Sequence, residues 1–407
     1  MKNLNIKKIS ALLLSAVLLT GCGPLDKNTL TPSRKAVKSI ACADNTSTDE
    51  TFSTAQYQFA IDLFSHSLNT KPDDNIMVSS YSMSMILAML ANGASSETQD
   101  EIKKAIYGSM DLNDLNACFK SWRESQPNSR KCKLSNANGI WLDSSIEGVK
   151  EEFLARNKVF YDAKIYQKDL NSDIVEDINK FCKDETDGMI PHVMDSMDNN
   201  IVMAIINAVS FDAKWKDKYS EDNIFQSNFE GIYGEQRATM LFSEENTYIE
   251  QNGAVGFLKY YKDNYAFVGI LPPDEMSVAE YAKTLTGESL RKMIQNRTER
   301  EIDVKIPKFK YDTSLDMKKI LTDMGISKIF TEEADFSALT NSHLKIDDVL
   351  HKTYIELDET STKTAAVSDV TVSAVNYEVY LNRPFLYMIL DMESELPIFI
   401  GTVQNIS

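Results

Sequence analysis

The sequence contains few of the residues on which hydrolytic enzymes and metal sites depend. Only four histidines occur among the 407 residues, and there is neither a G-x-S-x-G motif for a nucleophilic serine nor an H-E-x-x-H motif for zinc. The five cysteines share no short metal-ligand spacing. These absences argue against an enzyme, and we predict no cofactor and no metal site.

Positive charge and long apolar runs are also scarce. The chain has 43 Lys and Arg against 60 Asp and Glu, which gives a formal net charge of −17. A surface this acidic repels the phosphates of nucleic acid. Outside the N-terminus no run approaches the length of a membrane span. We therefore expect neither nucleic-acid binding nor a membrane-spanning domain.

The N-terminus has the pattern of a targeting segment. Three lysines precede an apolar run, Ile9–Leu19, which is too short to span a bilayer and ends in Leu19-Thr20-Gly21-Cys22. This pattern resembles a bacterial lipoprotein box, in which cleavage before Cys22 leaves the cysteine that carries the lipid. We expect a signal peptide over 1–21 and an extracytoplasmic protein anchored to a bacterial cell envelope or surface. The alternative is an ordinary secretory signal with a chance cysteine.

Composition divides the rest of the chain into a tether and one domain. Residues 22–52 are rich in Ser, Thr, Asn, Asp and Lys, which predicts a flexible tether after the lipidated Cys22. Residues 53–407 contain no linker-like stretch and form one large domain. An extracytoplasmic location permits disulfides, but the spacing assigns no pair. Free buried thiols are favoured for the remaining cysteines, which are Cys42, Cys118, Cys132 and Cys182.

Helix-like and strand-like segments are mixed without regular alternation. Apolar residues at three- and four-residue steps predict a helix over 54–70, and 82–90 has the composition of a buried helix. Residues 134–142 and 201–211 have the composition of strands, and the second is apolar enough to be covered on both faces. This irregular order predicts an α+β fold rather than a doubly wound one.

A long polar segment near the C-terminus, Asp358–Asn382, has the pattern of a strand. It contains no Gly or Pro, and small or β-branched residues fill most of 361–375. Even-numbered positions from 362 to 374 carry no charge, and the two charges, Lys363 and Asp369, fall on odd positions. Strand side chains alternate between faces, so one face of this segment can be buried. We interpret it as exposed in one state and a strand in another.

Several blocks of sequence, taken in order, are similar to those of the serpin superfamily. The resemblance runs from about residue 54 to the C-terminus. The blocks that carry it are Asn75–Ser82, Ile86–Gly93, Ile178–Lys180, Thr186–Pro191, Asn207–Trp215, Ile306–Phe309, Leu321–Gly325, Ala334–Ser337, His351-Lys352, Asn382–Phe385 and Pro397–Gly401.

The resemblance implies three β-sheets, eight or nine helices and an exposed reactive-centre loop, here the segment 358–382. In serpins a serine protease cleaves this loop as a substrate, and the loop then inserts into the central sheet while the protease is still acylated. Strand addition of this kind, for which serpins are a standard example, releases strain stored in the fold. The implied partner is a serine protease held in a covalent acyl complex.

The loop hinge departs from the usual serpin pattern at several positions. Glu359 and Thr362 fit the pattern. Ser361 replaces a glycine, Lys363 replaces an acid, and Thr364 replaces an alanine. The replacements that face the sheet are small, and Thr favours strands. By resemblance the hinge comprises Glu359, Ser361, Thr362, Thr364, Ala365 and Ala366.

The two ends of the loop give different positions for the cleaved bond. Family spacing counted from Glu359 places it between Val375 and Asn376, whereas counting back from Asn382–Phe385 places it after Ser373. Ala374 is the third candidate. The residues on the N-terminal side of these bonds are small, which suits an elastase-like or subtilisin-like protease. No Lys or Arg for a trypsin-like enzyme lies between Lys363 and Arg383.

The resemblance also assigns residues beneath the sheet opening. Ser79, Ser82, Asn207 and His351 occupy the positions of a hydrogen-bonded cluster that serpins reorganise when the sheet parts. Trp215 would lie near the top of that opening. Without the resemblance, these residues are ordinary core polar groups and a core aromatic.

The predicted function is therefore suicide-substrate inhibition of a serine protease by a monomer. The alternative is a non-inhibitory surface lipoprotein of the same fold that acts in binding or adhesion, which the departures at Ser361 and Lys363 would suit.

Overall fold

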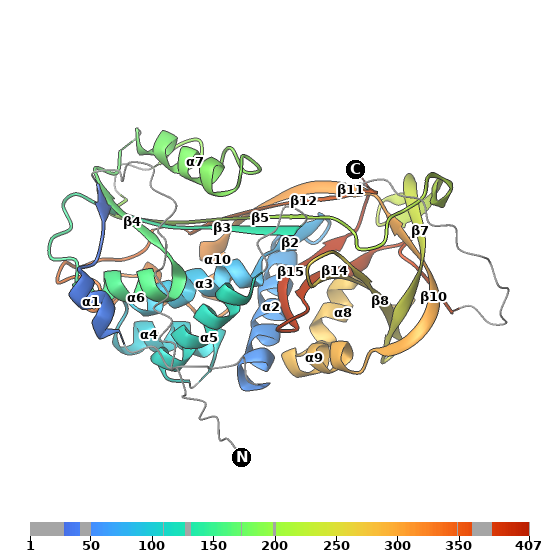
Figure 1. Cartoon of the computed structure of the whole chain (residues 1–407), viewed down its shortest axis with the longest axis horizontal. Coiled ribbons are helices and arrows are strands. Elements are labelled where there is room, and N and C mark those ends of the chain that lie inside the picture. The colour runs from blue at the N-terminus through green and yellow to red at the C-terminus, as the bar shows by residue number, and fades with distance from the viewer. Residues whose placement is uncertain are drawn as a thin grey trace, which may run out of the picture.

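The computed structural model has a layered α+β architecture, so the predicted fold class is confirmed (Figure 1). A broad sheet lies on one side of the molecule and most helices lie beneath it. The described residues are 28–40, 50–108, 110–126, 132–171, 173–197, 201–347, 349–359 and 377–406.

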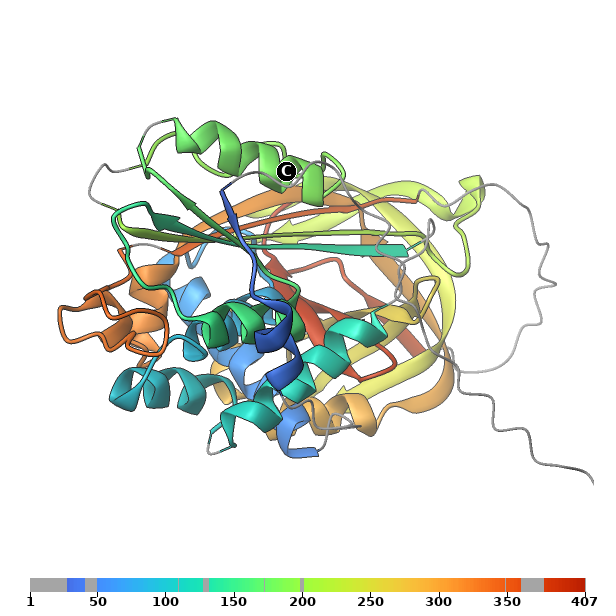
Figure 2. The same cartoon turned by 60° about the vertical axis from the view of Figure 1, so that its left-hand side comes forward.

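The broad sheet, here called the central sheet, has six strands in the order β1-β4-β3-β5-β12-β11. The pair β5–β12 is parallel, whereas β3–β5 and β12–β11 are antiparallel. Helix α7 (Ile174–Glu185) covers the outer face of this sheet (Figure 2). The strands are β1 (Thr29–Leu30), β4 (Lys164–Lys168), β3 (Cys132–Asp143), β5 (Met203–Ala213), β12 (Val349–Leu357) and β11 (Phe309–Asp316).

Strand β7 (Gly234–Gln251) joins the other strands into two further sheets, as predicted. Its first part pairs with β6 (Ile224–Gly231) and β10 (Thr298–Pro307), and β10 also pairs with β13 (Tyr377–Tyr380). Its last residues pair with β8. The third sheet continues through β8 (Ala254–Tyr260), β9 (Tyr265–Leu271), β14 (Phe385–Asp391), β15 (Leu396–Val403) and β2 (Ile76–Val78). Every residue of β9, β14 and β15 is buried, so the third sheet forms the centre of the core.

Ten α-helices occur in the described ranges, one more than the upper number expected. The additional helix is α1 (Arg34–Ser39). Helix α3 (Ser80–Ala91) is buried throughout, and the Ser79 side chain caps its N-terminus. The others are α2 (Glu50–Thr70), α4 (Ser96–Ile106), α5 (Leu112–Ser125), α6 (Glu151–Tyr161), α8 (Val278–Thr284), α9 (Gly287–Gln295) and α10 (Met317–Asp323). In the ranges that the structure describes, no helix combines the length and apolarity needed to cross a bilayer.

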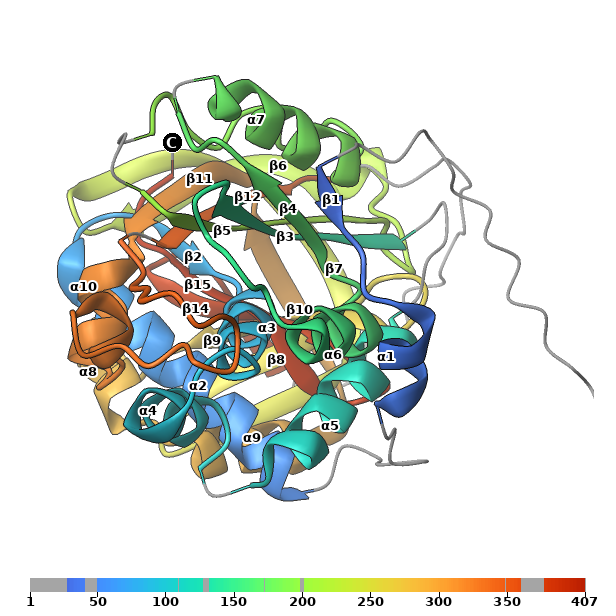
Figure 3. The same cartoon turned by 90° about the vertical axis from the view of Figure 1, so that its left-hand side faces the viewer.

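Residues 28–40 lie in the segment that was predicted to be a flexible tether, and here they are ordered. Leu30 pairs with Ile165 at the edge of the central sheet, and α1 packs beside α6 (Figure 3). The Ser33 hydroxyl accepts a hydrogen bond from the Ala36 amide, and the Ser33 amide donates to Glu151 at 2.8 Å. The composition did not predict these two elements, because a short edge strand and a capped helix need few apolar residues.

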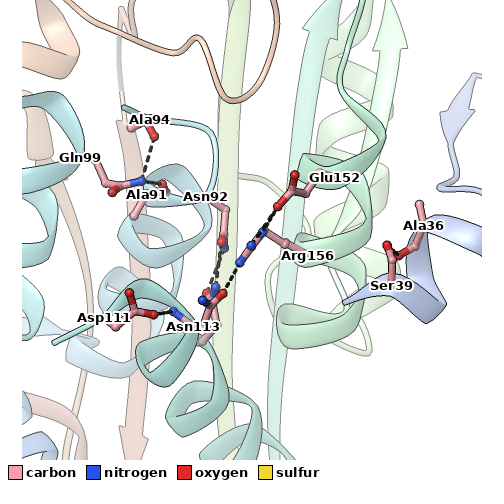
Figure 4. Close-up of polar contacts among 11 residues, drawn as sticks. Ala36, Ser39, Ala91, Asn92, Ala94, Gln99, Asp111, Asn113, Glu152 and Arg156 are labelled. Atoms are coloured by element: carbon pink, nitrogen blue, oxygen red, sulfur yellow. Dashed lines mark hydrogen bonds and ion pairs between the residues drawn. The ribbon is translucent and has the colours of Figure 1, made fainter. Parts of the chain in front are cut away.

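Polar side chains, some buried and some exposed, link the helices beneath the central sheet (Figure 4). Asn92, at the end of α3, and Asn116 of α5 exchange two amide hydrogen bonds of 3.0 and 2.8 Å. Arg156 of α6 donates to Glu152 at 2.9 Å and to Asn113 of α5 at 2.7 Å. A buried polar group without a hydrogen-bond partner lowers the stability of the folded protein. The Asn92–Asn116 pair therefore specifies how α3 packs against α5.

Two of the cysteines are free and buried, namely Cys118 and Cys182. Burial raises the pKa of the Cys182 thiol to about 12, which keeps it protonated and unreactive. The prediction of free buried thiols is confirmed for these two residues. Cys42 and the side chain of Cys132 lie outside the described part of the chain.

Candidate functional site

The parallel strands β5 and β12 are paired along only part of their length. Their register pairs Val349 with Ile205 and ends where Lys352 meets Ala208. Both strands continue beyond that point, β5 to Ala213 and β12 to Leu357. They run along the top of the molecule in Figure 1. On their other edges β5 is paired with β3 over its full length, and β12 is paired with β11 from residue 350 to residue 357. The central sheet is therefore split between β5 and β12 at one end.

The split holds a cavity of about 400 Å³. Residues 211–213 of β5 and 354–357 of β12 line its two sides. Its floor includes apolar side chains from the third sheet, namely Met77, Ile389 and Phe399. The free edges of two strands thus face each other across an apolar floor.

This geometry suits one additional strand. Neighbouring strands of a sheet lie about 4.8 Å apart, so an inserted strand needs free edges on both sides and an apolar face toward the core. A segment that follows β12 directly and turns back would run antiparallel to β12. It would also run antiparallel to β5, because β5 and β12 are parallel. Complete insertion requires the Val349–Lys352 pairing with β5 to separate.

Trp215 lies at the upper end of the split. Its indole Nε1 donates a hydrogen bond of 2.9 Å to the carbonyl oxygen of Asp358, the residue after β12. The ring stacks on Tyr261 with centroids 4.1 Å apart and an angle of 9° between planes. On the other side the buried Lys259 ammonium lies 5.4 Å from the ring, held by Glu245 at 2.6 Å. Trp215 therefore links the start of the loop to the residues that pack around its ring.

Replacing Trp215 by Phe will destabilise the uncleaved protein more than replacing Trp122 by Phe. Both indoles are buried, but Trp122 Nε1 has no hydrogen-bond partner among the described residues. The first change removes a hydrogen bond along with the larger ring, and the second removes only the ring and an unsatisfied donor. We expect a difference of about 1–2 kcal/mol in the free energy of unfolding, measured in urea. Equal losses would show that the bond to Asp358 contributes nothing.

Glu359 forms a second attachment at the same end. Its carboxylate makes an ion pair with Lys308, the residue between β10 and β11. The hydrogen bond from Lys308 lowers the pKa of Glu359 below its ordinary value. Both side chains are about one third exposed, so the pair contributes at most about 1 kcal/mol. Glu359 is the last described residue at the N-terminal end of the predicted loop.

A hydrogen-bonded cluster lies deeper, where β5 and β12 are still paired. The Ser79 amide donates to Nε2 of His351 at 3.1 Å, and the Ser79 hydroxyl donates to the carbonyl oxygen of Ile398 at 3.0 Å. The Ser82 amide donates to the Ser79 hydroxyl at 3.1 Å. His351 pairs in register with Asn207 of β5. The cluster connects α3, the third sheet and β12 at the point where the split begins.

Burial lowers the pKa of His351 from its ordinary 6.5 to about 4. The ring is therefore neutral at pH 7. Because Nε2 accepts from the Ser79 amide, the proton of the neutral ring lies on Nδ1. That Nδ1 is buried without a hydrogen-bond partner in the described part of the structure. Protonation of His351 at Nε2 would remove the acceptor of the Ser79 amide and so disrupt the cluster.

Sequence reasoning missed two threonines that extend this cluster. The Thr353 hydroxyl donates to the Met77 carbonyl oxygen at 2.8 Å, and the Met77 amide donates to the Thr313 hydroxyl at 3.0 Å. Both are buried and join the central sheet to β2. The structure places Thr313 opposite Thr353 on adjacent strands, a register that the sequence alone does not reveal.

The other predicted site residues are only partly placed. The structure brings Ser79, Ser82 and His351 into one cluster and puts Trp215 and Glu359 at the open end of the sheet. Asn207 is placed by its backbone, and its side chain lies outside the described residues. Also outside them are Cys22, hinge residues Ser361, Thr362, Thr364, Ala365 and Ala366, and the candidate bond residues Ser373, Ala374, Val375 and Asn376.

Comparison with known proteins assigns the family. A family model described as serpin (serine protease inhibitor) matches residues 54–406. Plasma serine protease inhibitor of Homo sapiens is 25 % identical over 85 % of this chain and 88 % of its own length. The native-state crystal structure of the thermophilic serpin Tengpin is 37 % identical, with a TM-score of 0.83 over 93 % of this chain and 100 % of that one. Thyroxine-binding globulin in complex with thyroxine, 23 % identical, has the same fold with a TM-score of 0.78 over 87 % of this chain and 99 % of that one. The chain belongs to the serpin family.

Proposed function

We propose that this serpin inhibits serine proteases as a suicide substrate. The observation that carries the proposal is the split between β5 and β12, which leaves two free strand edges above an apolar floor. The segment that follows β12 has uncharged residues at alternate positions from 362 to 374. If these face Met77, Ile389 and Phe399, the charged Lys363 and Asp369 lie on the outer face of the sheet. Insertion then places no charge against the apolar floor.

The covalent step begins when the protease accepts the loop as a substrate. The protease serine oxygen attacks the carbonyl carbon of Val375, or of Ser373 or Ala374, and the peptide bond to the next residue breaks. The released amine takes up the proton, and the N-terminal part of the loop stays on the protease as an ester. Insertion of that part as a new strand then carries the acyl-enzyme away from the entry end of the split before water reaches the ester.

The free energy released by insertion is large enough to distort a protease. Each backbone hydrogen bond contributes about 0.5–1.5 kcal/mol net, so a dozen inserted residues yield on the order of 10 kcal/mol. The contacts that oppose insertion are fewer, namely the Trp215 bond to Asp358, the Glu359 pair and the short Val349–Lys352 ladder.

We further propose that the targets are elastase-like or subtilisin-like and that the protein acts at a bacterial cell envelope or surface. The small residues at 373–375 support the first point. The motif Leu19-Thr20-Gly21-Cys22 supports lipid anchoring through Cys22. A monomer suffices for this mechanism, because the loop and the split belong to one chain.

A non-inhibitory role is the second candidate. The departures at Ser361 and Lys363 favour it, and the complex of thyroxine-binding globulin with thyroxine shows that a protein of this fold can bind a small molecule. In that case the loop would be cut without trapping the enzyme.

A panel of proteases separates the two candidates. The soluble domain is mixed with elastase, subtilisin, chymotrypsin and trypsin and run on a denaturing gel, and the released C-terminal peptide is sequenced. We expect a covalent complex with elastase or subtilisin and a peptide that begins between Ala374 and Asn376. Trypsin is the matched control, because no Lys or Arg lies between Lys363 and Arg383. Cleaved protein with fully active enzyme in every case contradicts inhibition.

A further inference from the structure

Helix α1 carries a cluster of positive charge in a strongly acidic protein. Its six residues include Arg34, Lys35 and Lys38 and no acidic residue, whereas the chain as a whole has a formal net charge of −17. Lys38 lies four positions after Arg34 and three after Lys35, so the three side chains share one face of the helix. All three residues are exposed, whereas Ala36 and Val37 are partly buried. The three cations therefore form a basic face of α1 that is open to solvent.

The basic face of α1 has no counterion. Among the described residues, none of its three cations has an ion-pair partner. The two carboxylates at the start of the neighbouring α6 are engaged elsewhere, because Glu151 accepts from the Ser33 amide at 2.8 Å and Glu152 accepts from Arg156 at 2.9 Å. Like charges three and four positions apart destabilise a helix that nothing compensates. An anionic partner outside the chain would supply the compensation.

The length of chain before Asn28 indicates where such a partner lies. The argument rests on the lipid anchor at Cys22 that is part of the proposed function. Asn28, the first described residue, is the sixth residue after Cys22. Six residues span at most about 20 Å when they are fully extended. If Cys22 is held in a bilayer, the end of the protein that carries β1 and α1 must lie close to the bilayer surface.

β1 and the open end of the split lie at opposite ends of the central sheet. Thr29 pairs with Tyr166 of β4, which pairs with Trp141 near one end of β3. At the other end of β3, Cys132 pairs with Ala213, the last residue of β5 at the split. The nine residue steps of β3 between these two levels span about 30 Å. In Figure 1, α1 lies at the left end of the molecule, and β10, which pairs with the first strand after the loop, lies at the right end.

We propose that the basic face of α1 binds the anionic phospholipid headgroups of the membrane that holds Cys22. Cations beside a lipid anchor add to membrane affinity, and their contribution falls off within a Debye length of the surface. That length is about 10 Å at 0.1 M salt, so the acidic surface farther from the bilayer is screened from it. With α1 held at the bilayer, the reactive loop at the other end of the central sheet faces away from the membrane, where proteases arrive.

Vesicle binding of the chain from residue 22 onward tests the basic face. A single myristoyl chain is attached to the N-terminal amine of Cys22, because one such chain binds bilayers only marginally, with an association constant of about 10⁴ M⁻¹. Binding is measured by co-sedimentation with vesicles of phosphatidylcholine alone and of equal parts phosphatidylcholine and phosphatidylglycerol. We expect about 100-fold tighter binding to the anionic vesicles, since each cation near the surface contributes about fivefold. Replacing Arg34, Lys35 and Lys38 together by Gln will abolish this preference.

The matched control replaces three lysines at the far end of the sheet by Gln, namely Lys216, Lys218 and Lys262. The first two follow β5 at the split, and the amide of Lys262 donates to the carbonyl oxygen of Lys214 at 2.8 Å. This variant has the same net charge as the α1 variant, and it will keep the preference for anionic vesicles. Equal losses in the two variants would show that net charge, rather than the basic face of α1, determines binding, and would overturn the proposal.

Lysine acetylation followed by mass spectrometry provides a measurement on the unsubstituted protein. On anionic vesicles Lys35 and Lys38 will be acetylated more slowly than on neutral vesicles, while Lys216 keeps its rate. Equal rates for Lys35 and Lys38 on both kinds of vesicle overturn the proposal. The mass of the mature protein from its own cells tests the anchor separately. A protein without lipid at Cys22 overturns the anchor and this inference with it, whereas a lipidated protein without a preference for anionic vesicles overturns this inference alone.

Discussion

Under the proposed mechanism, replacing Thr364 by Arg will turn the protein from an inhibitor into a substrate of the protease that it traps. Position 364 belongs to the uncharged alternation, so its side chain must face the core when the loop inserts. An unpaired buried charge costs about 3–5 kcal/mol, enough to stop insertion near its start. We expect the covalent complex to fall at least about 100-fold, while the loop is still cut. The complex is quantified on denaturing gels against active enzyme remaining.

The matched control is Ala365→Arg, one residue further along the loop. In the proposed inserted strand its side chain lies on the face opposite the third sheet, together with that of Lys363. This variant will keep most of its inhibitory activity. If both arginine variants lose activity equally, the alternation does not determine which face is buried.

Heat stability gives a second measure of the same variants. Loop insertion is expected to increase the free energy of unfolding by about 10 kcal/mol. Divided by the unfolding entropy of some 350 residues, this increase will raise the Tm of the cleaved wild-type protein by about 10–20 °C. The cleaved Thr364→Arg variant will show a much smaller rise. A cleaved wild-type protein that melts at the same temperature as the intact protein favours the non-inhibitory alternative.

Acidification will destabilise the uncleaved protein through His351. Its pKa is about 4 in the folded protein and about 6.5 in the unfolded chain, because burial disfavours the charged ring. The unfolded state therefore binds the proton more tightly. The contribution to stability is complete above pH 6.5 and is lost as the pH falls from 6.5 toward 4. By pH 5 the expected loss from this residue is about 2 kcal/mol.

Urea unfolding at pH 7 and pH 5 measures this effect. The His351→Gln variant lacks the titrating ring, so its stability will fall between these pH values by about 2 kcal/mol less than that of the wild type. His192 is the control, since its ring is half exposed at the surface. The His192→Gln variant controls for the loss of one histidine at the surface. Identical pH profiles for wild type and His351→Gln would contradict the buried neutral histidine.

The sequence was sufficient to predict the fold class and the family. The order of the motifs along the chain carried this information, because several short blocks such as Asn207–Trp215 follow one another as they do in serpins. It also indicated that Ser79 and His351 belong to one site, although they lie 272 positions apart in the chain. Their direct hydrogen bond could be seen only in the structure.

Contacts that depend on tertiary packing could not be predicted in the same way. Trp215 had the pattern of an ordinary core aromatic, and nothing local to it signals the bond to Asp358. The Lys308–Glu359 pair joins residues that lie far apart in the chain and carry no shared motif. Residues 28–40 have a tether-like composition, yet they pair with the edge of the central sheet because that edge offers unpaired backbone groups.

A crystal structure of the protein cleaved in its loop tests the central claim most directly. If the account is right, residues from about 361 onward will form a strand between β5 and β12, antiparallel to both, with Thr362, Thr364 and Ala366 over Met77 and Phe399. The Val349–Lys352 ladder with β5 will be replaced by pairing to the new strand. A cleaved protein whose loop stays outside the sheet, with Lys352 still paired to Ala208, would contradict it.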